Sequence, residues 1–160
     1  GELGTIAASV GIICHYLAGN PDLQASLRAQ PQHLSNSIDE ILRINPPLIA
    51  NRRKTTESVT LGGVDIPEGA QLTLLWVAAN RDEKCFGEKN AYAPERNKAD
   101  NLLYGTGLHC CPGAPLARME LIMLTELLLS HSRHWWPGSR PAVKAIYPAG
   151  GFKKVYIQLD

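Results

Sequence analysis

The feature that most constrains the chain is a glycine-rich loop that carries a cysteine and leads directly into a helix. Residues 104–120 read YGTGLHCCPGAPLARME. Gly105, Gly107 and Gly113 allow the backbone to turn tightly and to approach a flat object closely. Cys111 lies just before the expected helix, where the helix dipole and free N–H groups favour a thiolate over a thiol. We therefore expect this loop to present a thiolate ligand.

The same segment resembles the haem-binding loop of the cytochrome P-450 superfamily. The family pattern is an aromatic residue, Gly, any residue, Gly, any residue, a basic residue, any residue, Cys, any residue and Gly. These places are filled here by Tyr104, Gly105, Gly107, His109, Cys111 and Gly113. The resemblance implies that Cys111 is the axial ligand of haem b (iron protoporphyrin IX), because a thiolate pushes electron density onto the iron and favours O–O cleavage. Tyr104 is a mild departure, since the family usually has Phe. The alternative is a glycine loop that precedes a helix and holds a buried structural cysteine.

Composition limits the other classes of protein. The chain has 160 residues, 44% hydrophobic content and a net charge of +1. That length and apolar content suffice for one core, and the charge suggests neither a nucleic-acid partner nor an anionic membrane surface. No apolar run approaches a membrane span, and no signal peptide is visible. The four cysteines fit no common zinc spacing, so the expected setting is a reducing cytoplasm with free thiols.

Apolar periodicity predicts a mainly α fold with a small β region. Helices are expected over residues 5–18, 22–29 and 114–130, and from a cap at Ser35 or Ser37 to just before Pro46. Residues 59–66 predict a hairpin that turns at Gly62–Gly63, and residues 144–160 predict two short strands. Residues 71–78 read as a strand or a short helix entry, and residues 80–102 as an irregular functional connection.

A second motif supports the resemblance. Glu40 and Arg43 form an E-x-x-R pair on one helix face, a pattern that by itself is usually an exposed pair worth under about 1 kcal/mol. In the family, this pair joins an Arg of the later irregular segment in a buried network that holds the haem-binding core. The P-E-R run that ends at Arg96 resembles that segment, so Arg96 is the expected third member.

The resemblance also implies two contacts to the haem propionates. Arg53 follows the Pro46–Pro47 pair and precedes the hairpin, where a family arginine pairs with one propionate; His109 pairs with the other from the Cys loop. A cation beside a carboxylate of a buried cofactor is the expected arrangement. The alternative is that Arg52 and Arg53 are both solvated cations.

The first helix resembles the end of the family's oxygen-binding helix, which carries (Ala/Gly)-Gly-x-(Asp/Glu)-Thr over the haem. Residues 1–5 read GELGT here, so Thr5 is retained while Gly4 stands where the acid is expected. The threonine hydroxyl would steady bound dioxygen, and the acid would help to deliver protons. The change at Gly4 therefore bears directly on proton delivery.

Other candidate residues are explained without a ligand. Cys110 is out of register with the glycines by one position and is interpreted as packing. His131 and His134 have the i, i+3 spacing that can bind a metal, but the ordinary interpretation is cations at a helix C-terminus. The Trp135–Trp136–Pro137 run predicts a packed helix exit.

The resemblance extends over nearly all of residues 1–160, yet family members are far longer. The expectation is one partial domain, the C-terminal part of the cytochrome P-450 fold, most similar to soluble bacterial members. The implied activity is monooxygenation of a small organic substrate with O2 and electrons from a ferredoxin or flavoprotein reductase. One alternative is a haem-binding or haem-free fragment without turnover; another is peroxide-driven oxidation. The sequence leaves the substrate, the redox partner and the oligomeric state undetermined.

Overall fold

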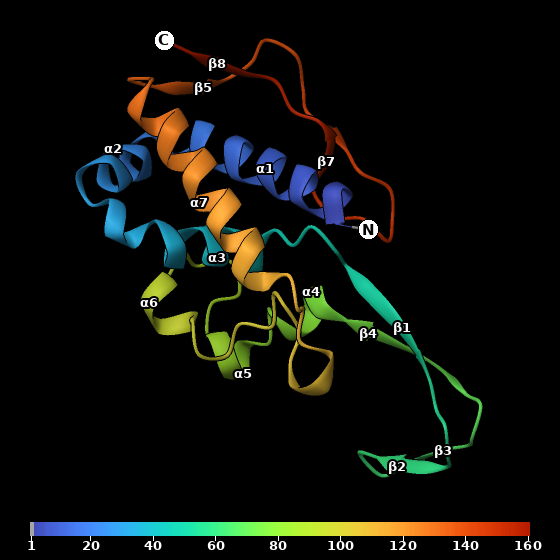
Figure 1. Ribbon diagram of the computed structural model, residues 1–160. Coiled ribbons are helices and arrows are strands. Elements are labelled where there is room, and N and C mark those ends of the chain that lie inside the picture. Colours follow the sequence, from blue (N-terminus) through green and yellow to red (C-terminus); the bar gives the residue numbers. More distant parts are fainter. Residues whose placement is uncertain (1) are drawn as a thin grey trace.

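The protein is mainly helical in the computed structural model, which describes residues 2–160 (Figure 1). The helices are α1 (Glu2–Ala18), α2 (Pro21–Ala29), α3 (Leu34–Ile44), α4 (Trp76–Ala79), α5 (Glu83–Phe86), α6 (Pro94–Asn97) and α7 (Ala114–Ser130), with 3-10 turns at Pro31–His33 and Gly107–His109. The small β region is divided among pairs of antiparallel strands. The strands are β1 (Ala50–Lys54), β2 (Val59–Leu61), β3 (Val64–Ile66), β4 (Gln71–Leu75), β5 (Trp135–Pro137), β6 (Val143–Lys144), β7 (Phe152–Lys154) and β8 (Ile157–Leu159). This is the fold class that the sequence predicted.

Three helices form the core. α1, α3 and α7 pack against one another, with α2 closing one end (Figure 1). The most deeply buried apolar side chains come from all of these helices and from the tail: Ile12, Leu17, Leu27, Leu34, Ile38, Ile41, Leu42, Leu121 and Trp135. Burial of an Ile or Leu side chain is worth about 1.5–3 kcal/mol. The helix that follows the Cys loop, α7, and the helix α3 that packs against it therefore belong to the best-anchored part of the chain.

The start of α3 differs from the prediction. The helix begins at Leu34, and its N-cap is His33, which makes no capping hydrogen bond through its side chain. Ser35 and Ser37 both lie inside the helix, and Ser37 is buried there. A preceding 3-10 turn at Pro31–His33 leads the chain into α3, so no serine cap is needed.

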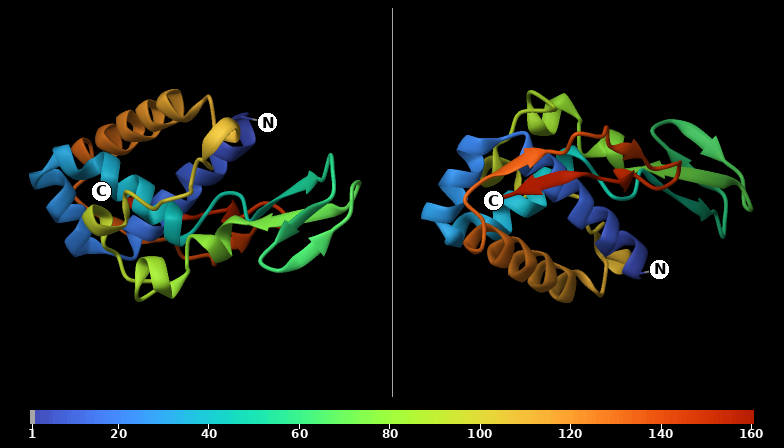
Figure 2. Two further views of the ribbon diagram at one scale, coloured as in Figure 1. Left: turned by 90° about the horizontal axis from the view of Figure 1, so that it is seen from below. Right: turned by 90° about the horizontal axis from the view of Figure 1, so that it is seen from above.

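A β arm extends away from the helices. β1 pairs with β4, and beyond them the β2–β3 hairpin projects from the body of the molecule (Figures 1 and 2). Gly62 and Gly63 form its turn with φ of +58° and +80°, values that favour glycine and confirm the predicted hairpin. The sequence left open whether residues 71–78 form a strand or enter a short helix. The structure has both, because strand β4 runs directly into helix α4.

The tail lies along α1 and corrects one expectation. Trp135–Trp136–Pro137 is not a helix exit but strand β5, paired with β8. Trp135 is 1% exposed, and the buried Gln24 of α2 accepts from its N–H and donates to its C=O, each at 3.0 Å. This side-chain amide completes the hydrogen bonds of a strand that lies against a helix rather than inside a sheet.

No single helix among the described residues is long and apolar enough to cross a membrane. α1 and α2 reach that length and composition only together, and they are bent by 105° relative to one another.

Candidate functional site

The Cys loop is held by its own backbone. The N–H of Cys111 donates to the C=O of Tyr104 at 2.8 Å, and the N–H of Gly105 donates to Leu102 at 2.9 Å. The N–H of Ala114, the first residue of α7, donates to the C=O of Cys111 at 3.2 Å. These bonds bring Tyr104, Gly105 and Cys111 together at the entrance of the helix, as the sequence predicted.

Two of the three glycines need glycine's conformational freedom. Gly105 and Gly107 have φ of +72° and +64°, and a Cβ on Gly105 would lie 3.4 Å from the carbonyl oxygen of His109. Gly113 is different: as N-cap of α7 it has φ of −83°, which any residue adopts. Gly113 lies in the tight turn at residues 112–113 that leads into α7, as expected, but this turn does not require glycine, so a need for glycine there would have to come from close approach of a ligand.

The loop presents its side chains to the outside. Residues 106–112 are all exposed, and the apolar Leu108 is fully so. Cys111 carries a free, exposed thiol. Cys110 is exposed as well, so the interpretation of Cys110 as a packing residue is wrong. The two cysteines differ in their backbone hydrogen bonds rather than in burial, because it is the N–H of Cys111 that donates to the C=O of Tyr104.

The helix that carries Thr5 lies opposite this loop. In Figure 1 the loop, drawn in gold, lies below the N-terminal half of α1. Seen from below and from above, the loop and this half of α1 overlap (Figure 2). Thr5 is exposed on that half of α1, and its C=O accepts from Ser9 Oγ at 2.9 Å.

Arg53 and His109 lie on separate elements. Arg53 is half-buried on β1, on the same face as Asn51, whereas Arg52 is exposed on the other face. Its Nη1 donates to the C=O of Arg52 at 2.9 Å. Because Arg53 is less exposed than Arg52, the burial pattern favours Arg53 as the arginine that would contact a buried cofactor. His109 is exposed at the end of its 3-10 turn.

The E-x-x-R pair forms the predicted buried ion pair. Arg43 and Glu40 are 0% and 2% exposed, and Arg43 Nε donates to Glu40 Oε2 at 2.7 Å. Arg43 Nη2 donates to Oε1 of the same carboxylate at 3.0 Å, and Nη1 donates to the C=O of Asn80 at 2.6 Å. The pair joins α3 to the irregular segment before the Cys loop.

The third member of the network is Asn97, not Arg96. Asn97 is 1% exposed, and its Nδ2 donates to Glu40 Oε1 at 2.7 Å. Arg96 is exposed and donates to the side chain of Asn97 and to the C=O of Phe86, so it supports the network from outside. A short helix, α6, turns neighbouring residues to different sides, which explains why the P-E-R motif misplaced the contact by one residue. The side-chain amide of Asn97 donates a hydrogen bond to the Glu40 carboxylate without placing a second cation in the core.

The Glu40 network makes stability depend on acid. Burial alone would raise the pKa of Glu40, but hydrogen bonds from Arg43, the Ala93 N–H and Asn97 hold it below the ordinary 4.5. Because the folded pKa lies below the unfolded one, the network stabilises the fold fully above about pH 4.5 and loses this contribution as pH falls through the folded pKa. We expect the free energy of unfolding of the parent chain, measured in urea, to fall as the pH is lowered below about 4.5. In Glu40→Gln it should fall less steeply over the same pH range. Equal pH dependence in the two proteins would contradict this role of Glu40.

A second cluster that the sequence did not reveal lies beside the loop. Asp39 Oδ2 accepts from Arg118 Nε at 2.9 Å, and the Arg118 guanidinium lies 4.4 Å from the centroid of the Tyr104 ring. Burial raises the pKa of Tyr104 to about 12, and the Asp39 charge adds to the effect. No sequence signal relates Asp39 to Arg118, because they lie on different helices, α3 and α7.

The Tyr104 hydroxyl is buried and has no hydrogen-bond partner among the described residues. An unsatisfied buried polar group costs about 1–3 kcal/mol, so we expect Tyr104→Phe to leave the free energy of unfolding unchanged or to raise it by about 1 kcal/mol. The matched control is Tyr92→Phe, which loses a hydrogen bond to Ser37 and should lower stability by about 1 kcal/mol. Chemical denaturation measures both, and a loss at Tyr104 as large as that at Tyr92 would show that the hydroxyl is satisfied.

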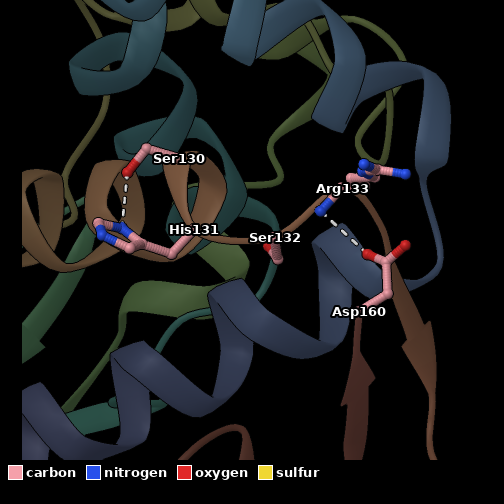
Figure 3. A pocket seen from close by; sticks show the side chains of 5 residues that line it. All are labelled: Ser130, His131, Ser132, Arg133 and Asp160. Atoms are coloured by element: carbon pink, nitrogen blue, oxygen red, sulfur yellow. Dashed lines mark hydrogen bonds between the residues drawn. The ribbon is translucent and has the colours of Figure 1, made fainter.

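The paired histidines do not form a metal site. A surface pocket of about 500 Å³ lies at the C-terminal end of α7, the end remote from the Cys loop. Figure 3 shows the five side chains that line it. His131 bonds there to Ser130, and Asp160 accepts from the N–H groups of Arg133 and His134, so the contacts form separate pairs without a common centre. No group of three or more His, Cys, Asp or Glu side chains within residues 2–160 could hold a metal ion.

Fold and loop together define a class: mainly helical proteins that present an exposed cysteine, here Cys111, on a glycine loop at the start of a long helix. The chain belongs to the cytochrome P450 family, whose model matches residues 13–146. It is similar to cytochrome P450 144 of Mycobacterium tuberculosis, with 37% identity over 127 residues, covering 79% of this chain and 29% of that protein. It is also similar to 6-deoxyerythronolide B hydroxylase of Saccharopolyspora erythraea, with 37% identity over 111 residues, covering 69% and 28% of the two chains.

Solved structures agree. The substrate-free cytochrome P450 CYP150A6 of Mycobacterium marinum superposes with a TM-score of 0.91 at 28% identity, over 98% of this chain and 41% of that chain. CYP108D1 of Novosphingobium aromaticivorans superposes with a TM-score of 0.90 at 30% identity, over 98% and 38%. The chain thus has part of the P450 fold and spans well under half the length of these relatives.

The donor chemistry of the loop fits haem, the cofactor that the family implies. The free, exposed thiol of Cys111 lies beside that of Cys110, among exposed loop residues that include the apolar Leu108, and the imidazole of His109 is two residues from Cys111. A single thiolate suits a metal whose other ligands come from its own macrocycle. Close approach of such a ring would also account for glycine at position 113.

Proposed function

We propose that the protein functions as a haem-thiolate monooxygenase, which oxidises a small organic substrate with O2 and electrons from a ferredoxin or a flavoprotein reductase. The observation that carries this proposal is the free, exposed thiol of Cys111 at the start of α7. The backbone N–H of Cys111 donates to the C=O of Tyr104, which holds the loop in place. Relatives named as a hydroxylase and as an epoxidase support an oxygen-inserting reaction. The chain would contribute the C-terminal part of the catalytic unit.

Each site residue has a proposed task. Cys111 would hold the haem iron through its thiolate, and Arg53 and His109 would bind the propionates. Tyr104, Gly105 and Gly113 would shape the loop. When bound, haem supplies oxygen activation and the electron-accepting centre, while the protein supplies binding, orientation and electrostatics.

Thr5 would act from α1. Its hydroxyl would hold a proton for oxygen activation, from its exposed place in the N-terminal half of that helix. Gly4 supplies no acid, and a Cβ at this position would meet nothing within 4 Å. A carboxylate introduced by Gly4→Asp therefore has room and should improve coupling of electrons to product if proton delivery limits the reaction.

One observation supports a second candidate. Gly4 stands where the family acid is expected, so a haem-binding or haem-free chain without turnover is the alternative. Peroxide-driven oxidation is a variant that needs no reductase.

Haem titration tests the proposal. We expect the chain to bind one haem, and Arg53→Gln and His109→Gln to weaken haem binding because each removes a cation from a propionate. Arg52→Gln is the matched control, since Arg52 is exposed on the other face of β1. The loaded chain is then supplied with a reductase system or with peroxide, and the supported oxidation separates the candidates. Absence of haem uptake by the parent chain would contradict the proposal for the chain as it stands.

A further inference from the structure

Both stems of the Cys loop are attached to one residue of α3. Before the loop, Asn101 Nδ2 donates to the backbone C=O of Asp39 at 3.0 Å. After the loop, Arg118 in the second turn of α7 donates to the Asp39 carboxylate at 2.9 Å. Asp39 therefore joins the two ends of the loop to the helix that also carries Glu40 and Arg43.

The second contact continues into the loop. The Arg118 guanidinium lies over the Tyr104 ring, 4.4 Å from its centroid, and the Tyr104 C=O accepts the N–H of Cys111 at 2.8 Å. A cation over an aromatic face is attracted by the ring quadrupole, and the attraction grows when the pair is partly desolvated. Arg118 is 42% exposed and Asp39 is 18% exposed, so the cluster is partly shielded from water.

Few other contacts restrain this part of the chain. The side chains of residues 106–112 are exposed and so cannot fix the loop by packing. The Cys111 backbone is hydrogen-bonded on one side to the C=O of the half-buried Tyr104 and on the other to the N–H of the buried Ala114 in α7. Restraint of Tyr104 by Arg118 should therefore pass to the cysteine.

We propose that Asp39 and Arg118 are positioning residues, which hold the Tyr104 ring and, through the Tyr104 carbonyl, the backbone of Cys111. The consequence for a thiolate ligand rests on the proposed function. The contacts themselves do not, because they are made between side chains and backbone groups of this chain.

Amide hydrogen exchange of the haem-free chain tests the contacts. We expect Arg118→Ala to speed exchange of the Cys111 N–H by about tenfold while amides in the middle of α3 keep their protection. The matched control is Arg140→Ala, which removes another arginine stacked on a tyrosine, Tyr156 at 3.9 Å, in the tail. Unchanged Cys111 exchange in Arg118→Ala, or an equal rise in Arg140→Ala, would overturn the proposal.

A conservative variant covers the case in which Arg118→Ala does not fold. Arg118→Lys keeps the charge beside Asp39 but lacks the planar guanidinium that stacks on Tyr104. We expect a smaller increase in Cys111 exchange, about threefold. No increase in a folded Arg118→Lys, when Arg118→Ala is unfolded, would count against the proposal.

Reconstitution with haem provides the second readout. We expect Arg118→Ala to bind haem in the same ratio as the parent but to show a smaller share of the carbon monoxide band of thiolate-ligated haem. A share equal to that of the parent would contradict the role in positioning Cys111. If the parent chain takes up no haem, the proposed function fails, while the exchange measurement still decides whether the cluster holds the loop.

Discussion

Arg43→Ala is expected to lower the free energy of unfolding by about 3–5 kcal/mol, because it leaves the Glu40 carboxylate buried without its counter-ion. Glu40 is 2% exposed, so water cannot replace the lost guanidinium. The same change removes the donor to the Asn80 C=O and the cation that lies 4.7 Å from the Phe86 ring centroid. Urea denaturation followed by circular dichroism measures the loss.

The chain offers a control with the same spacing. Lys98 and Glu95 also form an i, i+3 ion pair, at 2.9 Å, but their side chains are 58% and 56% exposed. Lys98→Ala should leave the unfolding midpoint unchanged, because an exposed pair gains little over solvated charges. Similar effects of Arg43→Ala and Lys98→Ala would contradict the role of burial in this account.

Gly150→Ala is expected to have an effect of similar size, about 3 kcal/mol or more, through overpacking. A Cβ on Gly150 would lie 1.9 Å from the carbonyl oxygen of Pro46, and the Gly150 N–H donates to Pro47 at 2.9 Å. The added methyl group must separate the tail from the segment that follows α3, which breaks that hydrogen bond.

Thermal unfolding compares this variant with Gly4→Ala. A Cβ on Gly4 meets nothing within 4 Å, and Gly4 lies in a helix, where alanine is favoured. Gly4→Ala should therefore leave the melting temperature unchanged or raise it slightly. A melting temperature of Gly150→Ala within about 2 °C of the parent would show that the tail can move aside at little cost.

Local patterns in the sequence predicted much of the fold. The α7 helix and the β2–β3 hairpin were predicted because apolar spacing and a Gly-Gly turn act over a few residues. The Trp135 strand was missed, because its pairing with β8 and its bonds to Gln24 are made by residues distant in sequence. A tryptophan pair before a proline is compatible with a helix exit and with a strand, so the local sequence does not distinguish the two.

The site was predictable to the extent that its motifs are local. The Cys loop was predicted because its glycines and cysteine are close in sequence, and Glu40 with Arg43 because they share a helix face. Asn97 replaced Arg96 because only the folded path of α6 decides which side chain reaches Glu40. The pairing of Asp39 with Arg118 depends on how α3 packs against α7, which a single sequence does not encode in any local pattern.

The most direct test of the central claim is the difference spectrum of the reduced, carbon monoxide-bound chain after reconstitution with haem. We expect a Soret band at the position typical of thiolate-ligated haem, present in the parent and in Cys110→Ala and absent in Cys111→Ala. Retention of that band in Cys111→Ala, or its absence from a parent chain that has bound haem, would contradict the assignment of Cys111 as the iron ligand.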